Sequence, residues 1–477
     1  GADRLVLLFN HHALRADDPL GLSRAEFDTN PRQTTPNALA YDTRKTVRQT
    51  QLGAAWEHRL NAEQRLELMG WLGQRGVWQY QAIPPAAQAA PGSAGGVIDL
   101  DRAYGGAHAR WRLDRPMGDA TLGLVAGLTW SRQREQRAGY ENFIGPHLGV
   151  LGRLRRDETN LADAAEPYVQ AEWRTPGWTL AGGLRHSHVR FTSRDHYIAP
   201  GNGDDSGRTR YSGISPVIGG RVQLAESLQA FASVGGGFET PTLNEAAYSP
   251  GAQAGLNRGL SASRQQSAEI GLRGRHGWGG WTATLFDVRT QDEIVPAQNL
   301  GGRTTFQNAG RTHRHGLELS ADAEFGPVTL TGAATFIEAR FRDGYSKCAA
   351  PPCANPADVV PAGRRIPGIA RQQLYAQLDW RLAWAQGAVL GLEARHTGRV
   401  PVNDANSDFA GAATVLALSL RHDITRGAWR LQPFLRIDNL TNRRYAGSVI
   451  VNEGNGRFFE PAAGRSIFVG LEVRARR

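Results

Sequence analysis

The 477-residue sequence predicts an all-β protein, a transmembrane antiparallel β-barrel with about eighteen recognisable strands. Three observations predict this fold. Segments of 9–14 residues alternate apolar and polar side chains along the whole chain, and none shows helical periodicity of any length. Tight turns and long loops alternate between these segments. No apolar run approaches the ~18 residues that a transmembrane helix needs. A membrane barrel needs no such run, because its strands alternate apolar and polar residues and their mean hydropathy is therefore low.

Taken in chain order, the clearest strands are 122–131, 317–325, 430–438 and 467–473. Each has an apolar side and a polar or small side, which is typical of one face against lipid and one against a wet lumen. The apolar sets are Leu122, Leu124, Ala126, Leu128, Trp130; Leu317, Leu319, Ala321, Ala323, Phe325; Leu431, Pro433, Leu435, Ile437; and Ile467, Val469, Leu471, Val473.

The connections separate into two kinds. The tight ones are "RLNAEQ", "DRPMGDA", "TPGW", "LAES", "HGWGG", "FGP", "WAQG" and "TRGA". The long ones lie near 15–42, 80–97, 139–164, 193–210, 241–261, 343–365 and 447–464, with two shorter ones near 296–303 and 401–411. This asymmetry is typical of an outer-membrane barrel, with short turns on the periplasmic side and long loops outside. A soluble sandwich has no reason for it, and no blade repeat favours a propeller.

Two features mark the expected membrane boundaries. Trp130, Trp173, Trp178 and Trp429 fit aromatic girdles, although ordinary packing explains any single tryptophan equally well. Arg132 and Arg134 continue the outward side of 122–130 beyond its apolar band, where they meet either anionic lipid headgroups or solvent.

Charge and motifs exclude several function classes. The net charge is +10 and the pI near 10.0, but arginines stand beside Glu, Asp and Gln rather than in basic runs, which disfavours nucleic-acid binding. The His pairs 11–12, 186/188 and 313/315 lack a third ligand, so no metal site and no cofactor are expected. The sequence contains no G-x-S-x-G motif and no recognisable paired-carboxylate arrangement, so no enzyme is expected. Cys348 and Cys353 are interpreted as a disulfide closing a small loop.

Several motifs resemble those of TonB-dependent outer-membrane receptors. The first is "GGGFETPTLNE" (235–245), which is similar to their GFR-x-PT-x-x-E segment. "NAGRTHRHGLEL" (308–319), "GRRIPGIAR" (363–371), "RIDNLTNRRYAG" (436–447) and "FFEPAAGRSIFVGLEV" (458–473) resemble further strands of that barrel. They occur in order over the last half of the chain, and together they are specific. The resemblance extends more loosely to 154–160 and 193–207.

The resemblance also implies an organisation. The family has a plug domain followed by a 22-stranded barrel, and here residues 1–477 are expected to be the barrel domain alone, without plug, TonB box and first strands. Glu239 stands where the family usually has Arg, and Arg477 ends the chain where an aromatic residue is common.

By this resemblance, the expected function is TonB-energised uptake of a scarce anionic solute, most simply a ferric siderophore, across the outer membrane of a Gram-negative bacterium. Alternatives are import of another bulky cofactor such as pyrroloquinoline quinone, a passive substrate-specific porin, or a surface role such as adhesin or phage receptor. The expected partners are the TonB–ExbB–ExbD complex, a small anionic ligand, and outer-membrane lipid and lipopolysaccharide. A monomer is expected.

The candidate ligand-binding residues are arginines and aromatic residues of the long loops. Guanidinium groups hold planar carboxylates through paired hydrogen bonds, and flat rings stack on catechol or quinone rings. The candidates are Tyr197, Arg210, Tyr248, Arg258, Arg457, Phe458 and Phe459.

Overall fold

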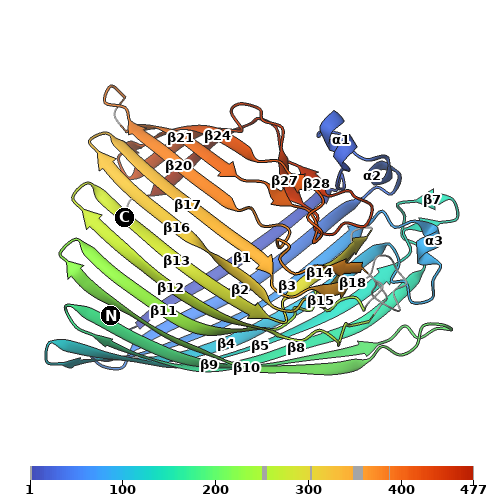
Figure 1. The fold of residues 1–477 in the computed structure, drawn as a ribbon, viewed down its shortest axis with the longest axis horizontal. Coiled ribbons are helices and arrows are strands. Elements are labelled where there is room, and N and C mark those ends of the chain that lie inside the picture. The colour runs from blue at the N-terminus through green and yellow to red at the C-terminus, as the bar shows by residue number, and fades with distance from the viewer. Residues whose placement is uncertain (1–2, 250–254, 301–302, 348–357, 386, 476–477) are drawn as a thin grey trace.

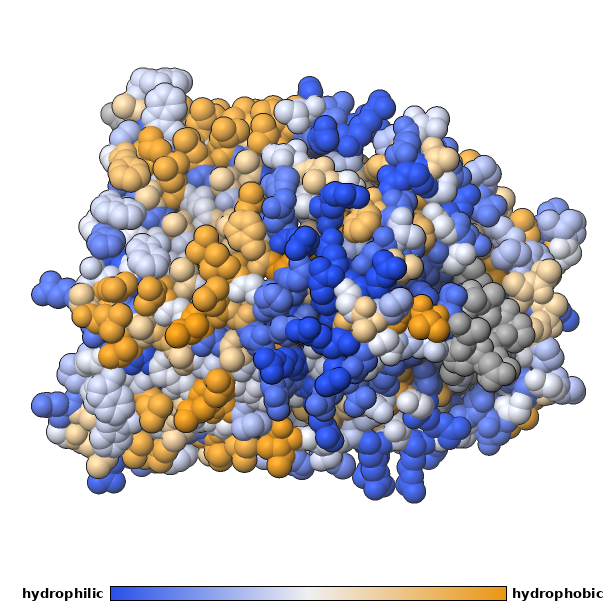
Figure 2. Space-filling model, viewed as in Figure 1, coloured by the Kyte–Doolittle hydropathy of each residue, from blue (hydrophilic) through white to orange (hydrophobic). Residues whose placement is uncertain are grey.

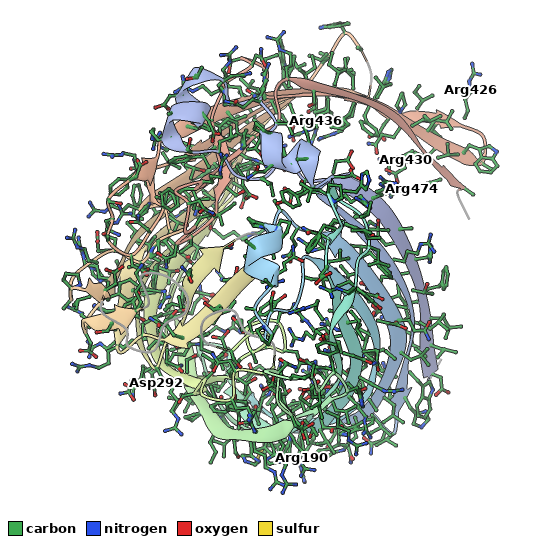
Figure 3. The ribbon with its side chains drawn as sticks, turned by 90° about the vertical axis from the view of Figure 1, so that its right-hand side faces the viewer. Arg190, Asp292, Arg426, Arg430, Arg436 and Arg474 are labelled. Atoms are coloured by element: carbon green, nitrogen blue, oxygen red, sulfur yellow. The ribbon has the colours of Figure 1, made fainter. Side chains whose placement is uncertain are left out.

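A computed structural model describes residues 3–249, 255–300, 303–347, 358–385 and 387–475. Its main element is one antiparallel sheet of 19 strands, which curls into a barrel-shaped wall (Figures 1 and 3). The strands are β1 Asp3–Asp17, β2 Arg44–Arg59, β3 Gln64–Tyr80, β4 Val97–Met117, β5 Ala120–Tyr140, β8 Leu154–Arg174, β9 Trp178–Asp195, β10 Gly207–Ala225, β11 Leu228–Glu239, β12 Ser263–His276, β13 Gly279–Gln291, β16 Thr312–Phe325, β17 Val328–Phe341, β20 Gln372–Arg381, β21 Ala388–Thr397, β24 Ala413–His422, β25 Ile424–Arg426, β26 Trp429–Asp438 and β29 Ser466–Ala475.

Each strand pairs with the next one along the chain. The short β25 continues β24 and pairs with β26, so the sheet has eighteen full strands, as the alternation predicts. Among the described residues, β1 pairs only with β2 and β29 only with β26, which makes these two strands the edges of the sheet.

Tight turns lie at one end of the wall and long connections at the other (Figure 1). Over their described residues, the long connections carry three short helices and five two-stranded hairpins. The helices are α1 Arg24–Thr29, α2 Pro36–Ala40 and α3 Pro85–Gln88. The hairpins are β6 Phe143–Ile144 with β7 His147–Leu148, β14 Ile294–Leu300 with β15 Arg303–Asn308, β18 Tyr345–Lys347 with β19 Asp358–Val360, β22 Val400–Pro401 with β23 Phe409–Ala410, and β27 Ala446–Val449 with β28 Phe459–Pro461. The predicted asymmetry of the connections is confirmed.

The apolar side chains of the strands point outward rather than into a core. Ile270, Leu285, Leu317 and Phe336 are paired in register across β12, β13, β16 and β17, and Ile270 is 61% exposed. Figure 2 shows hydrophobic side chains gathered toward the tight-turn end of this outer face. In water such exposure opposes folding, whereas in a bilayer the same side chains contact lipid.

The inner side of the wall is charged and internally paired. Arg174 contacts Asp114 at 2.6 Å, and Arg436 lies 3.3 Å from Glu393. These ion pairs match the polar alternate positions predicted for the lumen. Within the described residues, no helix is both long and apolar enough to cross a membrane. Cys348 and Cys353 lie outside the described residues, so their disulfide stays a prediction.

Candidate functional site

The long connections fold over one end of the barrel and hold one another. The Asn452 amide donates to the Pro296 carbonyl at 2.7 Å, which joins the 439–465 loop to the β14–β15 hairpin. Asn257 donates to the Phe306 carbonyl at 3.1 Å, which joins the 240–262 loop to the same hairpin. Leu22 forms an antiparallel bridge with Phe459. We call these interlocked connections the loop layer, and this end of the barrel the mouth.

Tyr248 is buried where the loop layer meets the barrel wall. It is 5% exposed and packs with Ala94 and Ala247. The guanidinium carbons of Arg137, Arg156 and Arg303 lie 5.3, 5.2 and 5.4 Å from its ring centroid. Arg137 also donates to the Tyr248 hydroxyl at 3.4 Å. Three cations therefore surround one buried phenol.

Two buried carboxylates balance part of this charge. Glu158 receives two hydrogen bonds from Arg156, at 2.6 and 2.8 Å, and Glu135 lies 3.6 Å from Arg137. The same Arg156 donates to the Ala247 carbonyl at 2.8 Å, which fixes the loop next to Tyr248. We call Tyr248, Arg137, Arg156, Arg303, Glu135 and Glu158 the Tyr248 cluster. Three guanidinium groups and two carboxylates leave it with an excess positive charge.

The excess charge changes the acidity of the phenol. Burial by itself raises the pKa of Tyr248, but the attraction of Arg137, Arg303 and Arg156 for a tyrosinate outweighs it and lowers the pKa from 10.0 to about 8. An anion is thus stabilised at this point of the mouth.

A second cluster surrounds Phe459, which is fully buried. Its ring lies 5.3 Å from that of Phe27 and 6.2 Å from that of Phe458, and the Arg24 guanidinium stacks over it at 4.1 Å. Val402 and Ala410 complete the cluster. Phe459 therefore anchors α1 and β28 to the loop layer rather than facing an open mouth.

Arg457 is engaged by α1. Its two terminal nitrogens donate to the two oxygens of Glu26 at 2.8 and 2.9 Å. Glu26 also accepts from the backbone of Ser23 in a capping box. This bond, followed by the Ser23 side chain and then by Arg457, lowers the pKa of the Glu26 carboxyl. The pair ties the 439–465 loop to the start of the loop after β1.

The other predicted ligand residues are placed separately. Tyr197 is half-buried, and its carbonyl accepts from Asn202 at 2.8 Å. Arg258 is exposed and lies against Gly207, where an added Cβ would come within 2.2 Å of its Nη1. Arg210 pairs in register with Arg190, which points away from the barrel in Figure 3, so Arg210 is on the outer face.

The structure therefore brings Arg457, Phe458 and Phe459 together and buries Tyr248 elsewhere in the loop layer. The ligand-binding role of all seven residues stays a prediction. Sequence reasoning missed Arg137, Arg156 and Arg303, which complete the Tyr248 cluster. A usable signal was the Arg–x–Glu or Glu–x–Arg spacing on inward strand positions, at 135–137 and 156–158, because residues two apart share a face.

Within the described part of the chain, no group of three or more His, Cys, Asp and Glu side chains is placed to hold a metal ion.

Comparison with known proteins identifies the barrel. A family model described as "TonB dependent receptor-like, beta-barrel" matches residues 2–440. The chain belongs to this family. Its members are outer-membrane receptors of Gram-negative bacteria, so the tight turns face the periplasm and the mouth faces the exterior.

Individual relatives are distant. The chain is 22% identical over 384 residues to the pesticin receptor of Yersinia enterocolitica (serotype O:8 / biotype 1B, strain NCTC 13174 / 8081), covering 76% of this chain and 52% of that protein. It is 24% identical over 373 residues to the ferrichrome receptor FcuA of Yersinia enterocolitica, covering 74% and 45%. The chain thus spans about half the length of the curated relatives it matches.

The fold is shared with solved structures. The siderophore receptor PiuA from Acinetobacter baumannii superposes with a TM-score of 0.77 at 13% sequence identity, covering 99% of this chain and 72% of that one.

Proposed function

We propose that the protein takes up a ferric siderophore across the outer membrane in a TonB-energised cycle. The observation that carries this proposal is the match of residues 2–440 to the receptor barrel family. A relative that bears the name of a ferrichrome receptor supports the cargo class. The TonB–ExbB–ExbD complex is the proposed energy source, and residues 1–477 are proposed to form the barrel domain.

The charge of the mouth supports an anionic cargo. Arg137, Arg156 and Arg303 outnumber the buried carboxylates beside them, and exposed Arg258 adds a further cation in the loop layer. Ferric chelates carry carboxylate, catecholate or hydroxamate oxygens, and guanidinium groups bind such oxygens through charge-assisted hydrogen bonds.

Uptake by the full-length receptor tests the proposal. Cells that express it as their only siderophore receptor are given ⁵⁵Fe-labelled ferric siderophores, with ferrichrome as the first probe and a catecholate as the second. We expect saturable accumulation that disappears when TonB is deleted. Accumulation that is proportional to external concentration and unchanged without TonB would instead support a passive porin.

Binding to purified receptor tests the mouth separately. Arg258→Ala removes an exposed cation and should weaken binding of the transported chelate by about 1.5–3 kcal/mol if it donates to a ligand oxygen. Arg426→Ala removes an exposed arginine at the tight turn between β25 and β26 and serves as the matched control. Equal affinities of the two variants and the wild type would remove Arg258 from the site.

Pyrroloquinoline quinone is kept as a second cargo, because it is also a flat polyanion suited to arginines and aromatic rings. It is tested in the same binding assay. A surface role as adhesin or phage receptor would use the same exposed loops and would survive deletion of TonB. The family consists of transport receptors, and we propose no enzymatic activity.

A further inference from the structure

Four segments of the loop layer meet at one buried point. They are β18, the turn of the β22–β23 hairpin, the β14–β15 hairpin and the 439–465 loop. The first two contribute Lys347 and Asp404, and the last contributes Asn452. We call Lys347, Asp404 and Asn452 the Lys–Asp–Asn triad. It lies apart from the Tyr248 cluster and shares no residue with it.

The Asn452 side chain is held by hydrogen bonds on both of its polar atoms. Its Nδ2 donates to the Pro296 carbonyl and to Asp404 Oδ2, each at 2.7 Å. Its Oδ1 accepts from the backbone N–H of Asp404 at 3.1 Å. The backbone is fixed as well, since the Asn452 N–H donates to the Val402 carbonyl and the Asn452 carbonyl accepts from the Asn299 N–H, both at 3.1 Å. These bonds define the orientation of the carboxamide.

Lys347 reaches the same carboxamide. Its Nζ lies 3.3 Å from Asn452 Oδ1 and 3.2 Å from Asp404 Oδ2. The sequence contains two lysines, and the other one, Lys45, is exposed on β2. A primary amine, a carboxylate and a carboxamide therefore lie within hydrogen-bonding distance of one another.

Water is largely excluded from the triad. Asp404 is 1% exposed and Asn452 is 6% exposed, and 15% of the Lys347 side chain is accessible. Tyr345, two residues before Lys347, packs against the buried apolar cluster that contains Phe341. Burial, followed by the charge of Asp404, raises the pKa of the Tyr345 phenol. Charged groups are poorly solvated in these surroundings, which favours transfer of a proton from the lysine to the aspartate.

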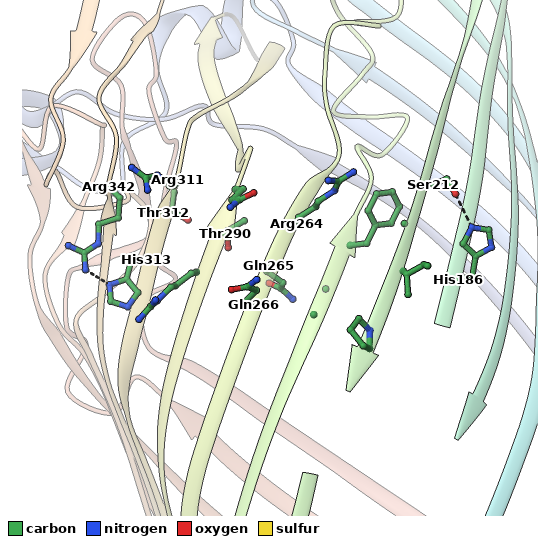
Figure 4. Close-up of a pocket in the computed structure, with 18 residues that line it drawn as sticks. His186, Ser212, Arg264, Gln265, Gln266, Thr290, Arg311, Thr312, His313 and Arg342 are labelled. Carbon is green, nitrogen blue, oxygen red and sulfur yellow. Dashed lines mark hydrogen bonds between the residues drawn. The ribbon is translucent and has the colours of Figure 1, made fainter. Parts of the chain in front are cut away.

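A groove in the barrel wall shows what distinguishes the triad (Figure 4). Arg264, Gln265 and Gln266 line this groove, which has a volume of about 1140 Å³, and all three side chains are exposed. Carboxamides and cations are thus neighbours there too. However, an arginine stays protonated and offers no lone pair, and neither lysine of the sequence lines the groove. Only the triad combines a carboxamide with an amine and with burial.

We propose that Lys347 and Asn452 form an intramolecular isopeptide bond, with Asp404 as the catalytic residue. The new bond joins Lys347 Nζ to Asn452 Cγ and replaces the Cγ–Nδ2 bond of the carboxamide. It links β18 to the 439–465 loop across 105 residues of chain. Unlike a disulfide, it requires no oxidant, because the reaction only exchanges one amine for another on the same carbonyl carbon.

Each step falls to an atom of the triad. Asp404 Oδ2 accepts a proton from Lys347 Nζ, and the neutral amine attacks Asn452 Cγ. The negative charge that develops on Oδ1 is stabilised by the Asp404 backbone N–H, which already donates to that oxygen. Oδ2 then delivers protons to Nδ2, and the Cγ–Nδ2 bond breaks. Nζ loses two protons and Nδ2 gains two, so ammonium leaves and Asp404 ends as a carboxylate.

The test is mass spectrometry of the full-length receptor after reduction, alkylation and digestion with trypsin. The arginine positions predict a peptide 445–457, which contains Asn452, and a peptide 343–364, in which Lys347 is left uncut because its amine is acylated. In the wild type we expect these two peptides as one branched species. Its mass should equal the sum of the two peptides less one molecule of ammonia.

Three variants assign the roles. Lys347→Arg keeps a cation beside Asp404 but removes the nucleophile, and Asp404→Asn keeps the shape of the side chain but removes the proton carrier. Both should give separate peptides with no loss of ammonia. Lys45→Arg replaces the other lysine and should keep the branched species. Heat-modifiable migration on gels confirms that each variant is folded.

The outcomes are distinct. Separate peptides of unchanged mass from the folded wild type would overturn the proposal. A loss of ammonia that persists in Lys347→Arg would overturn it as well, because it would indicate a succinimide, for which Asn455 followed by Gly456 is the candidate position. A branched species in Asp404→Asn would refute the catalytic role of the aspartate.

Discussion

Ionisation of Tyr248 offers a direct test of how the loop layer is held. The substitution Tyr248→Phe keeps the ring among Arg137, Arg156 and Arg303. It removes the hydroxyl group whose ionisation these three cations favour. Behind these cations lie Glu135 and Glu158, which neutralise only part of their charge. The wild-type loop should therefore dock more firmly at alkaline pH, and the variant should not.

The magnitude follows from the pKa of the phenol. The value of about 8 in the folded state lies below the ordinary 10.0, so the tyrosinate stabilises the docked state. This contribution is lost as the pH falls through about 8 and is complete above about 10. Because a tenfold change in an acid dissociation constant corresponds to about 1.4 kcal/mol, the contribution is about 1.4 kcal/mol at pH 9 and about 3 kcal/mol when complete.

Two measurements on the full-length receptor check this. Tyrosinate absorbance at 295 nm should rise by one equivalent near pH 8 in the wild type and not in Tyr248→Phe. Proteolysis of the 240–262 loop should slow about tenfold between pH 7 and pH 9 in the wild type alone. Tyr211→Phe, which removes the hydroxyl that donates to Leu260 at 3.0 Å, is the control. Identical titration curves for wild type and Tyr248→Phe would refute the reasoning.

Three further perturbations address the loop layer. Phe459→Ala should destabilise it by about 3–5 kcal/mol because the side chain is fully buried, whereas half-buried Phe458→Ala should cost less; comparative protease susceptibility ranks them. Gly95→Ala should open the 81–96 loop, since φ is +77° and the new Cβ would meet the Tyr140 carbonyl oxygen at 2.1 Å. Gly145→Ala, at φ +54° in open space, carries backbone strain alone, so equal hydrogen-exchange rates in the two loops would contradict the steric account. Arg457→Gln breaks the bidentate contact with α1 and should lower the free energy of local opening by about 1–3 kcal/mol, whereas unchanged amide exchange in α1 would show that the pair adds nothing.

The sheet and its sidedness could be predicted from the alternation of residues alone. A period of two along 317–325 requires that Leu317 and Glu318 face opposite sides, and register then carries the apolar side from strand to strand. The alternation of short and long connections along the chain predicted that all the long loops lie at one end of the barrel. Motifs in 235–473 indicated the receptor family, because those residues keep a recognisable order along the chain.

The contacts of the loop residues, by contrast, depend on the tertiary structure. Tyr248 meets Arg137, Arg156 and Arg303 from three other segments, and Arg457 finds Glu26 across 431 residues of chain. No repeating pattern in the sequence predicts either contact, because the segments against which a loop packs determine its conformation more than local propensity does. Arg210 shows the same limit in a strand. Because Arg210 lies next to a long loop, the sequence suggested a ligand-binding role for it. Its register with Arg190 places it on the outer wall instead. A shift of one residue along a strand moves a side chain from the lumen face to the membrane face.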